Sequence, residues 1–321
     1  MIIVTGAAGF IGSCMISELN NRGYKNIVAV DDFSRSDKNS NLQDKNLVDR
    51  INRDEFFEWA GKNKNDIQFI IHLGARTDTA EFDQAIFERL NLNYSKAMWE
   101  FCSDNQIPLI YASSAATYGL GEHGYSDDHD IVDKLQPLNA YGKSKNDFDK
   151  WMLKQEKEPP FWAGLKFFNV YGPNEYHKSR MASVVYHAFH QISQTGGMKL
   201  FRSHIPEFKD GEQSRDFIYV KDVTNMILWL MENKPKSAIY NTGTGVARSF
   251  IDLTRAVFDA LGKEENIQFI DTPEDIRDKY QYFTKAEMTK LRDQGYNESM
   301  TSLEEGVKDY VRNYLMKKKY L

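Results

Sequence analysis

Residues 2–12 read IIVTGAAGFIG, and this stretch carries most of what the sequence says about the fold. Its first four residues are apolar or β-branched and predict a buried strand. The glycines then predict a tight turn into a helix, whose free N–H groups and dipole suit a pyrophosphate. A second predicted strand ends in two aspartates about 20 residues later, as expected for a dinucleotide-binding unit. The residues concerned are Gly6, Gly9, Gly12, Asp31 and Asp32.

Short apolar runs alternate with helix-like segments over roughly the first three quarters of the chain. Strands are predicted over Ile2–Thr5, Ile27–Val30, Phe69–Leu73, Leu109–Ala112, Ala163–Asn169 and Ile239–Thr242. Helices are predicted over Ile11–Arg22, Phe82–Asn105, Tyr141–Gln155 and Val220–Glu232. Most of these strands are apolar on both faces, as strands of a covered parallel sheet must be. The pattern predicts an α/β fold with a Rossmann-type, doubly wound parallel sheet.

The alternation loosens after Gly172-Pro173 and predicts a smaller C-terminal α/β substrate lobe that caps the carboxyl edge of the sheet. The predicted elements of this lobe are Met181–Gln194, Phe250–Leu261, Ile267–Ile270 and Leu303–Met316. Because the strand at Ile239–Thr242 returns to the main sheet, the two domains are expected to interleave. The predicted division is 1–172 plus about 217–245 for the dinucleotide-binding domain, and about 173–216 plus 246–321 for the lobe.

The composition and charge of the chain exclude several classes of partner. The net charge is −5, and the one basic block is Lys317–Lys319, so nucleic acid is not an expected partner. No apolar run approaches the roughly 20 residues that cross a bilayer, so no membrane partner is expected. Cys14 and Cys102 show neither a disulfide framework nor a metal-ligand spacing. A cytoplasmic protein without a metal site is predicted.

Two polar groups near the middle of the chain suit acid–base chemistry. Tyr141 and Lys145 are four residues apart, so they share one face of a predicted helix. An ammonium beside a phenol lowers the pKa of the phenol, which then exchanges protons with a substrate hydroxyl. Ser114 follows a strand at the sheet edge where ligands bind, and can donate a hydrogen bond to the reacting oxygen. The alternatives are a chance Tyr-x-x-x-Lys pair and an ordinary Ser/Thr-rich turn.

The choice between NAD and NADP stays open on the residues alone. An acidic residue at the end of the second strand normally bonds the ribose hydroxyls and favours NAD. Arg35 and Lys38 follow closely and can hold a 2′-phosphate, which favours NADP. A solvated charged loop is an equally good interpretation of either basic residue.

Several motifs in one order resemble the extended short-chain dehydrogenases/reductases that modify sugar nucleotides. They are the glycine triplet, SSAATYG (113–119), Tyr141-x-x-x-Lys145, NVYGP (169–173) and RDFIYVKDV (215–223). The resemblance covers nearly the whole chain and implies an NAD(P)-dependent enzyme that acts on a nucleotide sugar. It also implies assembly into homo-oligomers, pentamers among them.

Within that family, three regions are similar to the branch that inverts C6″ of ADP-D-glycero-β-D-manno-heptose for lipopolysaccharide synthesis. These are residues 111–119, residues 168–184 and residues 280–284. The resemblance implies transient oxidation with bound NADP and non-stereospecific hydride return. It assigns Tyr141 to one face of the sugar and Lys178 to the other, with Lys145 tuning Tyr141. A 4-epimerase or reductase of another nucleotide sugar is the nearest alternative; a 4,6-dehydratase and a non-catalytic NADP-binding regulator fit less well.

The same resemblance assigns binding residues by position. The cofactor residues are Gly6, Gly9, Phe10, Ile11, Gly12, Asp31, Asp32, Lys38, Arg53, Leu73, Gly74, Ala75, Arg76, Thr77, Asn91, Lys145, Val170 and Lys178. The substrate residues are Asn169, Arg180, His187, Phe201, Arg202, Ser203, His204, Arg215 and Tyr280. Family members that match in this way mostly bind NADP. The chain departs from the pattern at Arg53, at Arg180, at 73–77 and in extra residues between 201 and 215.

Overall fold

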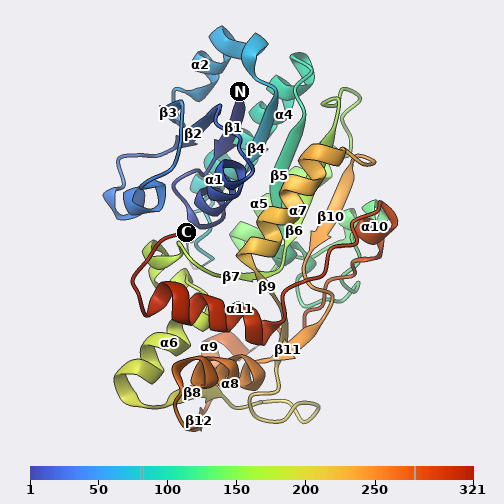
Figure 1. Ribbon diagram of the computed structural model, residues 1–321. Helices are drawn as coiled ribbons and strands as arrows, with labels where there is room; N and C mark the ends of the chain where they lie inside the picture. Colours follow the sequence, from blue (N-terminus) through green and yellow to red (C-terminus); the bar gives the residue numbers. More distant parts are fainter. Residues whose placement is uncertain (80, 82, 278–279) are drawn as a thin grey trace.

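Seven parallel strands form the central sheet of the computed structural model, which describes residues 1–79, 81, 83–277 and 280–321 (Figure 1). The strands are β1 (Ile2–Thr5), β2 (Ile27–Asp31), β3 (Asp49–Asn52), β4 (Phe69–His72), β5 (Leu109–Ser114), β6 (Trp162–Phe167) and β10 (Ala238–Thr242). Their order in space is β10-β6-β5-β4-β1-β2-β3. The chain order reverses between β1 and β4, and ligands of open α/β sheets bind at such a switch point.

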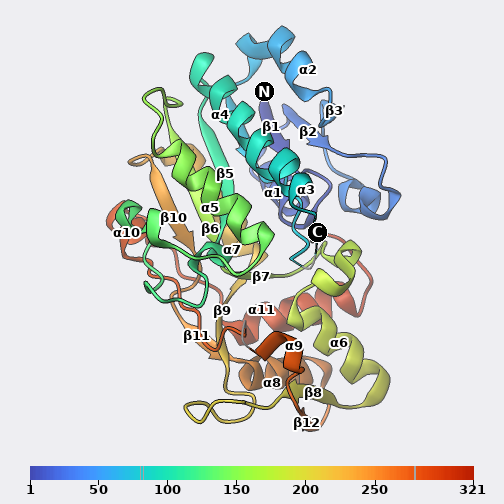
Figure 2. The ribbon, with the colours of Figure 1, turned by 180° about the vertical axis from the view of Figure 1, so that it is seen from behind.

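Helices cover both faces of this sheet (Figure 2). On one face α1 (Phe10–Asn21) and α7 (Val220–Asn233) pack on each other and on the strands. On the other face lie α2 (Phe56–Asn63), α4 (Tyr94–Asp104) and α5 (Ala140–Met152). The predicted Rossmann-type, doubly wound fold is confirmed.

A smaller lobe lies beyond the carboxyl ends of the strands (Figure 1). Its strands are β7 (Asn169–Tyr171), β8 (Met198–Phe201), β9 (Ser214–Tyr219), β11 (Ala247–Ser249) and β12 (Ile267–Ile270), and its longer helices are α6 (Val184–Thr195), α8 (Phe250–Leu261) and α11 (Leu303–Asp309). All of these elements except β11 contribute to an apolar core of the lobe. The interleaved domain boundaries stay a prediction; the one near residue 217 falls within β9.

The remaining elements are short. They are the 3-10 turns η1 (Ser36–Leu42), η2 (Lys64–Asp66), η4 (Ala115–Tyr118), η5 (His129–Lys134) and η6 (Tyr176–Met181), the π-helical segments η3 (Glu88–Asn93) and η7 (Tyr310–Leu315), and the helices α3 (Gln84–Phe87), α9 (Glu274–Arg277) and α10 (Thr289–Asp293). Within the described ranges, no helix combines the length and apolar character needed to cross a bilayer.

The structure corrects several predicted boundaries. The strand expected over Ala163–Asn169 is two strands, because the chain leaves the main sheet at Phe168 and pairs with β9 instead. The helix expected from Met181 begins at Val184, since Ser183 accepts from the Tyr186 N–H and caps it. The helix expected over Phe82–Asn105 is α3, η3 and α4; its first residue, Phe82, lies outside the described residues.

Candidate active site

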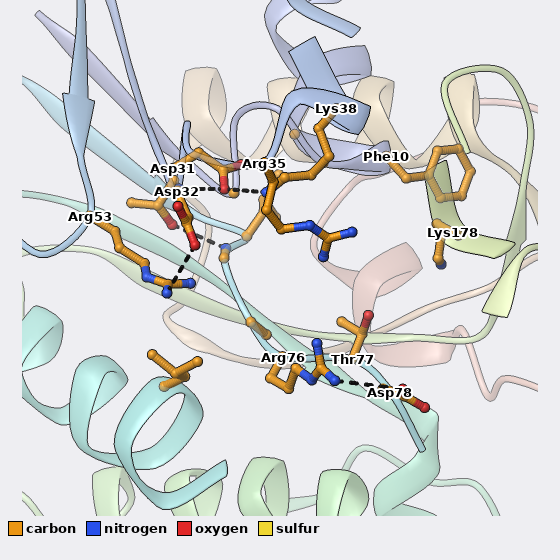
Figure 3. A pocket seen from close by; sticks show the side chains of 18 of the residues that line it. Phe10, Asp31, Asp32, Arg35, Lys38, Arg53, Arg76, Thr77, Asp78 and Lys178 are labelled. Carbon is orange, nitrogen blue, oxygen red and sulfur yellow. Dashed lines mark hydrogen bonds and ion pairs between the residues drawn. The ribbon is translucent and has the colours of Figure 1, made fainter. Parts of the chain in front are cut away.

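A cavity of about 770 Å³ opens at the switch point, between the ends of β1, β2 and β4 and the η6 turn of the smaller lobe. Figure 3 shows Phe10 and Lys178 at one end of it, and Asp31, Asp32 and Arg53 at the other. Sixteen of the residues that line it were predicted from the sequence, one of them, Arg180, as a substrate residue. They are Gly6, Gly9, Phe10, Ile11, Gly12, Asp31, Asp32, Lys38, Arg53, Leu73, Gly74, Ala75, Arg76, Thr77, Lys178 and Arg180.

The glycine turn brings two chain segments into close contact. Gly6 has a φ of 65°, and a Cβ there would lie 2.7 Å from the backbone nitrogen of Gly74. A Cβ on Gly12 would lie 2.1 Å from the Gly6 carbonyl oxygen. Among the described residues no side chain caps the start of α1, which leaves its first N–H groups available, and Gly9 to Gly12 line the cavity. That end of the helix is suited to a pyrophosphate.

The acidic pair at the end of β2 is bonded within the protein. One Asp31 oxygen accepts from Lys38 Nζ at 2.6 Å, and the other accepts from the Ala8 N–H at 2.8 Å. Asp32 accepts from both the N–H and the hydroxyl of Ser34. Its second oxygen lies 3.3 Å from Arg53 Nη2. The carboxylates that would favour NAD are therefore already satisfied by neighbouring donors.

Lys178 projects from η6 toward the opposite end of the cavity. Its Nζ lies 5.3 Å from the centroid of the Phe10 ring. Burial lowers the pKa of this amine, and the nearby Glu175 carboxylate opposes the shift. A lowered pKa makes the ammonium a stronger acid, so this group can give up a proton more readily than an exposed lysine. Ser179, the next residue, has a φ of 49° within this turn.

Tyr141, Lys145 and Ser114 lie together where α5 packs on the end of β5. Asn139 caps the helix by accepting from the Gly142 N–H at 2.8 Å, and Lys145 Nζ donates to the Ala112 carbonyl at 2.7 Å. Burial raises the pKa of Tyr141, and the Ser114 hydroxyl lowers it. Burial lowers the pKa of Lys145 to about 8.

Three predicted cofactor residues, Asn91, Lys145 and Val170, are not among those that line the cavity. Asn91 is buried, accepts from the Arg76 N–H at 2.8 Å and donates to the Ser144 hydroxyl at 2.9 Å. It thereby holds the loop after β4 against α5. Val170 packs between the two cores from β7.

The structure places the predicted substrate residues in three different settings. Arg215 is buried and lies 5.7 Å from the Tyr280 ring centroid, and Tyr280 also contacts the rings of Phe201 and His204. Arg202 and Ser203 belong to the same segment of the lobe. The side chains of Asn169 and His187 are exposed on β7 and α6. Arg180 instead lines the dinucleotide-sized cavity and contacts both Asp78 oxygens at 3.0 Å.

Sequence reasoning missed other members of the site. Asp78, Arg89 and Tyr94 line the cavity from a loop and helices that carry no motif. A buried Lys166–Asp149 ion pair behind Ser114 was also missed. A lysine inside the otherwise apolar WAGLKF strand was the one available signal.

Comparisons with known proteins agree with this geometry. The chain matches the NAD dependent epimerase/dehydratase family over residues 2–243. It is 50% identical to an ADP-L-glycero-D-manno-heptose-6-epimerase of Fusobacterium nucleatum, covering 99% of this chain and 98% of that one. A protein of the same name from Nitratidesulfovibrio vulgaris is 48% identical over 98% of each chain.

Solved structures show the same relationship. The Helicobacter pylori ADP-L-glycero-D-manno-heptose-6-epimerase superposes with a TM-score of 0.78 at 28% identity, covering 97% of this chain and 95% of that one. A UDP-N-acetylglucosamine 4-epimerase of Methanobrevibacter ruminantium reaches 0.82 at 21% identity, over 99% and 98% of the two chains, and shows that the fold is shared. The chain therefore belongs to the NAD dependent epimerase/dehydratase family, among its ADP-L-glycero-D-manno-heptose-6-epimerases.

Proposed function

We propose that this protein inverts C6″ of ADP-D-glycero-β-D-manno-heptose to give the L-glycero epimer, using bound NADP. The observation that supports this proposal most directly is that the two candidate proton-transfer groups come from different parts of the fold. Tyr141 belongs to a helix of the main sheet, whereas Lys178 reaches the cavity from the smaller lobe. Inversion of a carbinol centre needs a proton-transfer group on each face of the sugar. The names of the 50% and 48% identical relatives supply the choice of sugar.

A bound nicotinamide dinucleotide supplies reversible hydride transfer, so a carbon without an acidified C–H can be inverted through a ketone. The glycine turn and the start of α1 hold the pyrophosphate. Tyr141 accepts the proton of the 6″ hydroxyl as that carbon is oxidised, while the Ser114 hydroxyl donates to the same oxygen. The Lys145 ammonium favours the phenolate form of Tyr141. Lys178 serves the opposite face: once the ketone has turned to present that face, the Lys178 ammonium donates a proton to the carbonyl oxygen as the carbon is reduced, and is left as the neutral amine.

The preference for NADP is supported by the charges at the adenosine end of the cavity. The oxygens of Asp31 and Asp32 already accept from protein donors. Arg53 Nε is buried and makes no hydrogen bond among the described residues, although it lies 3.6 Å from Asp54. Arg35 lines the same end. Guanidinium groups so placed suit a 2′-phosphate, which needs charged donors.

Assembly into a homo-oligomer, with a pentamer as the expected form, and a cytoplasmic location complete the proposal. Both rest on the similarity to the heptose epimerases. Sedimentation of the purified protein measures the first directly.

The test is an assay without added reductant. Purified protein is incubated with ADP-D-glycero-β-D-manno-heptose, and the C6″ configuration is followed by NMR. We expect a mixture of both epimers, and a loss of roughly 100-fold or more in rate for Tyr141→Phe and for Lys178→Met. Tyr314→Phe is the matched control, because Tyr314 begins the chain's other Tyr-x-x-x-Lys pair, far from the cavity residues in sequence.

Absence of conversion by a protein that still binds NADP would reject the heptose and leave the family unchanged. UDP- and dTDP-hexoses would then be assayed for 4-epimerisation. Unchanged rates in both Tyr141→Phe and Lys178→Met would reject the two-group mechanism.

A further inference from the structure

A fully buried ion pair lies directly behind the strand end that carries Ser114. Lys166 Nζ, from β6, is 2.9 Å from Asp149 Oδ2, from α5, and the two side chains are 1% and 0% exposed. The proposed reaction uses neither residue. Taking two charges out of water carries a large desolvation cost, so a buried pair persists only with good geometry and further hydrogen bonds.

The remaining bonds of the pair reach β5 and the turn that follows it. Asp149 accepts from the Tyr111 hydroxyl at 3.0 Å and from the Ser113 hydroxyl at 2.6 Å. Lys166 donates to the Thr117 hydroxyl at 2.7 Å, and its Nζ lies 5.1 Å from the Tyr118 ring centroid. Both charges are therefore satisfied by the segment 111–118.

These bonds act on the groups assigned to proton transfer. Thr117, held by Lys166, donates to the Ser114 carbonyl at 2.8 Å. Asp149 follows Lys145 by four residues on α5 and lies on the same helix face. Lys145 in turn donates to the Ala112 carbonyl. Lys145 and Asp149, one turn apart on α5, thus both hydrogen-bond to the end of β5.

We infer that Asp149 and Lys166 are paired positioning residues for the acid–base group, fixing Ser114 against α5 and balancing the electrostatic field at Lys145. The inference rests on the proposed roles of Tyr141 and Lys145. The negative charge of Asp149 favours the cationic form of Lys145. By Coulomb's law, the positive charge of Lys166 beside Asp149 opposes this effect.

The two single variants should shift the pKa of Lys145 in opposite directions, which a simple loss of packing would not do. In Asp149→Asn the Lys166 cation is left unbalanced and lowers the pKa of Lys145. In Lys166→Met the Asp149 anion is left unbalanced and raises it. The double variant Asp149→Leu/Lys166→Met removes both charges, so the two effects cancel.

The described titratable groups near the pair and near Lys145 keep their charge state during this titration. Tyr111, Tyr118 and His129 interact with the pair, and His72 interacts with Lys145 itself. Burial raises the pKa of both tyrosines and lowers that of His129, and it lowers the pKa of His72 to about 3. All four stay neutral between pH 7 and pH 9, where Lys145, with a pKa of about 8, changes charge.

The experiment is an NMR titration of the full chain, labelled with 13C at lysine Cε and free of substrate. The Lys145 resonance is identified by its absence in Lys145→Met. We expect the pKa of Lys145 to move by about one unit in opposite directions in the two single variants, and to return in the double variant. The pH profile of epimerisation should move in the same senses.

Shifts in one direction for both single variants, or none, would overturn the inference. If one single variant fails to fold, the other decides, because a shift against its expected sign, or no shift, rejects the inference; Lys166→Arg and the double variant are the charge-matched controls. Lys166→Arg should leave the titration unchanged, and apolar replacement of a buried pair is often tolerated. Because the titration needs no sugar, its outcome is independent of whether ADP-heptose is the substrate.

Discussion

At the scale of single residues, Arg53 is where the cofactor preference can be tested. Its guanidinium lines the cavity beside Asp32, and a charge-assisted hydrogen bond to a 2′-phosphate contributes about 1.5–3 kcal/mol. Arg53→Ala should therefore weaken NADP binding by about tenfold to 100-fold. NAD, which lacks the phosphate, should bind with nearly unchanged affinity. Isothermal titration of both dinucleotides measures the ratio.

Arg22→Ala provides the control, since Arg22 pairs with Glu18 on the surface of α1. It should alter neither affinity. An equal loss of NAD and NADP binding in Arg53→Ala would mean that Arg53 holds the fold of the pocket rather than the phosphate.

The residues that could be predicted from the sequence are those whose role depends on their immediate neighbours in the chain. The turn Gly6-Ala7-Ala8-Gly9 can be recognised because the strand before it, its glycines and the helix after it are contiguous in the chain. Lys166 could not be assigned in this way, because its partners Asp149 and Thr117 lie 17 and 49 positions away. The one local signal, a lysine inside an apolar strand, does not distinguish a lysine buried against a carboxylate from one that extends to solvent.

At the scale of elements, the same limit applies to strands. β3 reads Asp-Arg-Ile-Asn and is partly exposed at one edge of the sheet, where it has a neighbour on one side only. An apolar pattern could not reveal it. The break at Phe168 depends on pairing with β9, some 50 residues later, and no local signal marks it. Strands buried on both faces, such as β1 and β4, were predicted to within a residue.

The strand β4 ends at His72, which gives the protein a predictable acid sensitivity. Its ring bonds Thr5 Oγ1 on β1 at 2.6 Å and Ser95 Oγ on α4 at 3.1 Å. Burial lowers the pKa of His72 to about 3, so the unfolded chain binds this proton first. Stability from His72 is complete above about pH 6.5 and is lost as the pH falls toward 3. The free energy of unfolding should fall by about 1 kcal/mol from this residue between pH 6.5 and 5.5.

Urea unfolding at pH 7.5, 6.5 and 5.5 measures this slope. His72→Asn should flatten it, whereas His123→Asn, at an exposed position, should leave it unchanged. His177, whose pKa burial lowers to about 4, contributes a similar slope, so the difference between variant and parent is the informative quantity. An identical slope in His72→Asn would show that His72 is not neutral in the folded state.

At the scale of the whole molecule, two distant segments meet over the cavity. Arg180, in η6, contacts both carboxylate oxygens of Asp78, which follows β4 and lies 102 positions earlier in the chain. Thr79 and Met181 make a further contact beside them. Asp78 and Arg180 both line the cavity, so we expect their ion pair to enclose a bound dinucleotide on this side. We therefore predict that this contact opens when the cofactor is released.

Breaking the pair should accelerate release by a modest factor. The Arg180 side chain is 65% exposed, and exposed ion pairs contribute up to about 1 kcal/mol, so Arg180→Ala should raise the rate of NADPH dissociation by at most about fivefold. Stopped-flow fluorescence without sugar measures this rate and excludes effects on substrate binding. Asp78→Ala should act similarly, and the double variant should release no faster than either single one. Salt at high concentration should abolish the difference in NADPH release rate between the variants and the parent. Arg202→Ala, whose partner Asp271 lies in the smaller lobe, should release NADPH at the parent's rate. Additive effects in the double variant would mean that the two residues act on the cofactor separately and that the lobes are not joined through them.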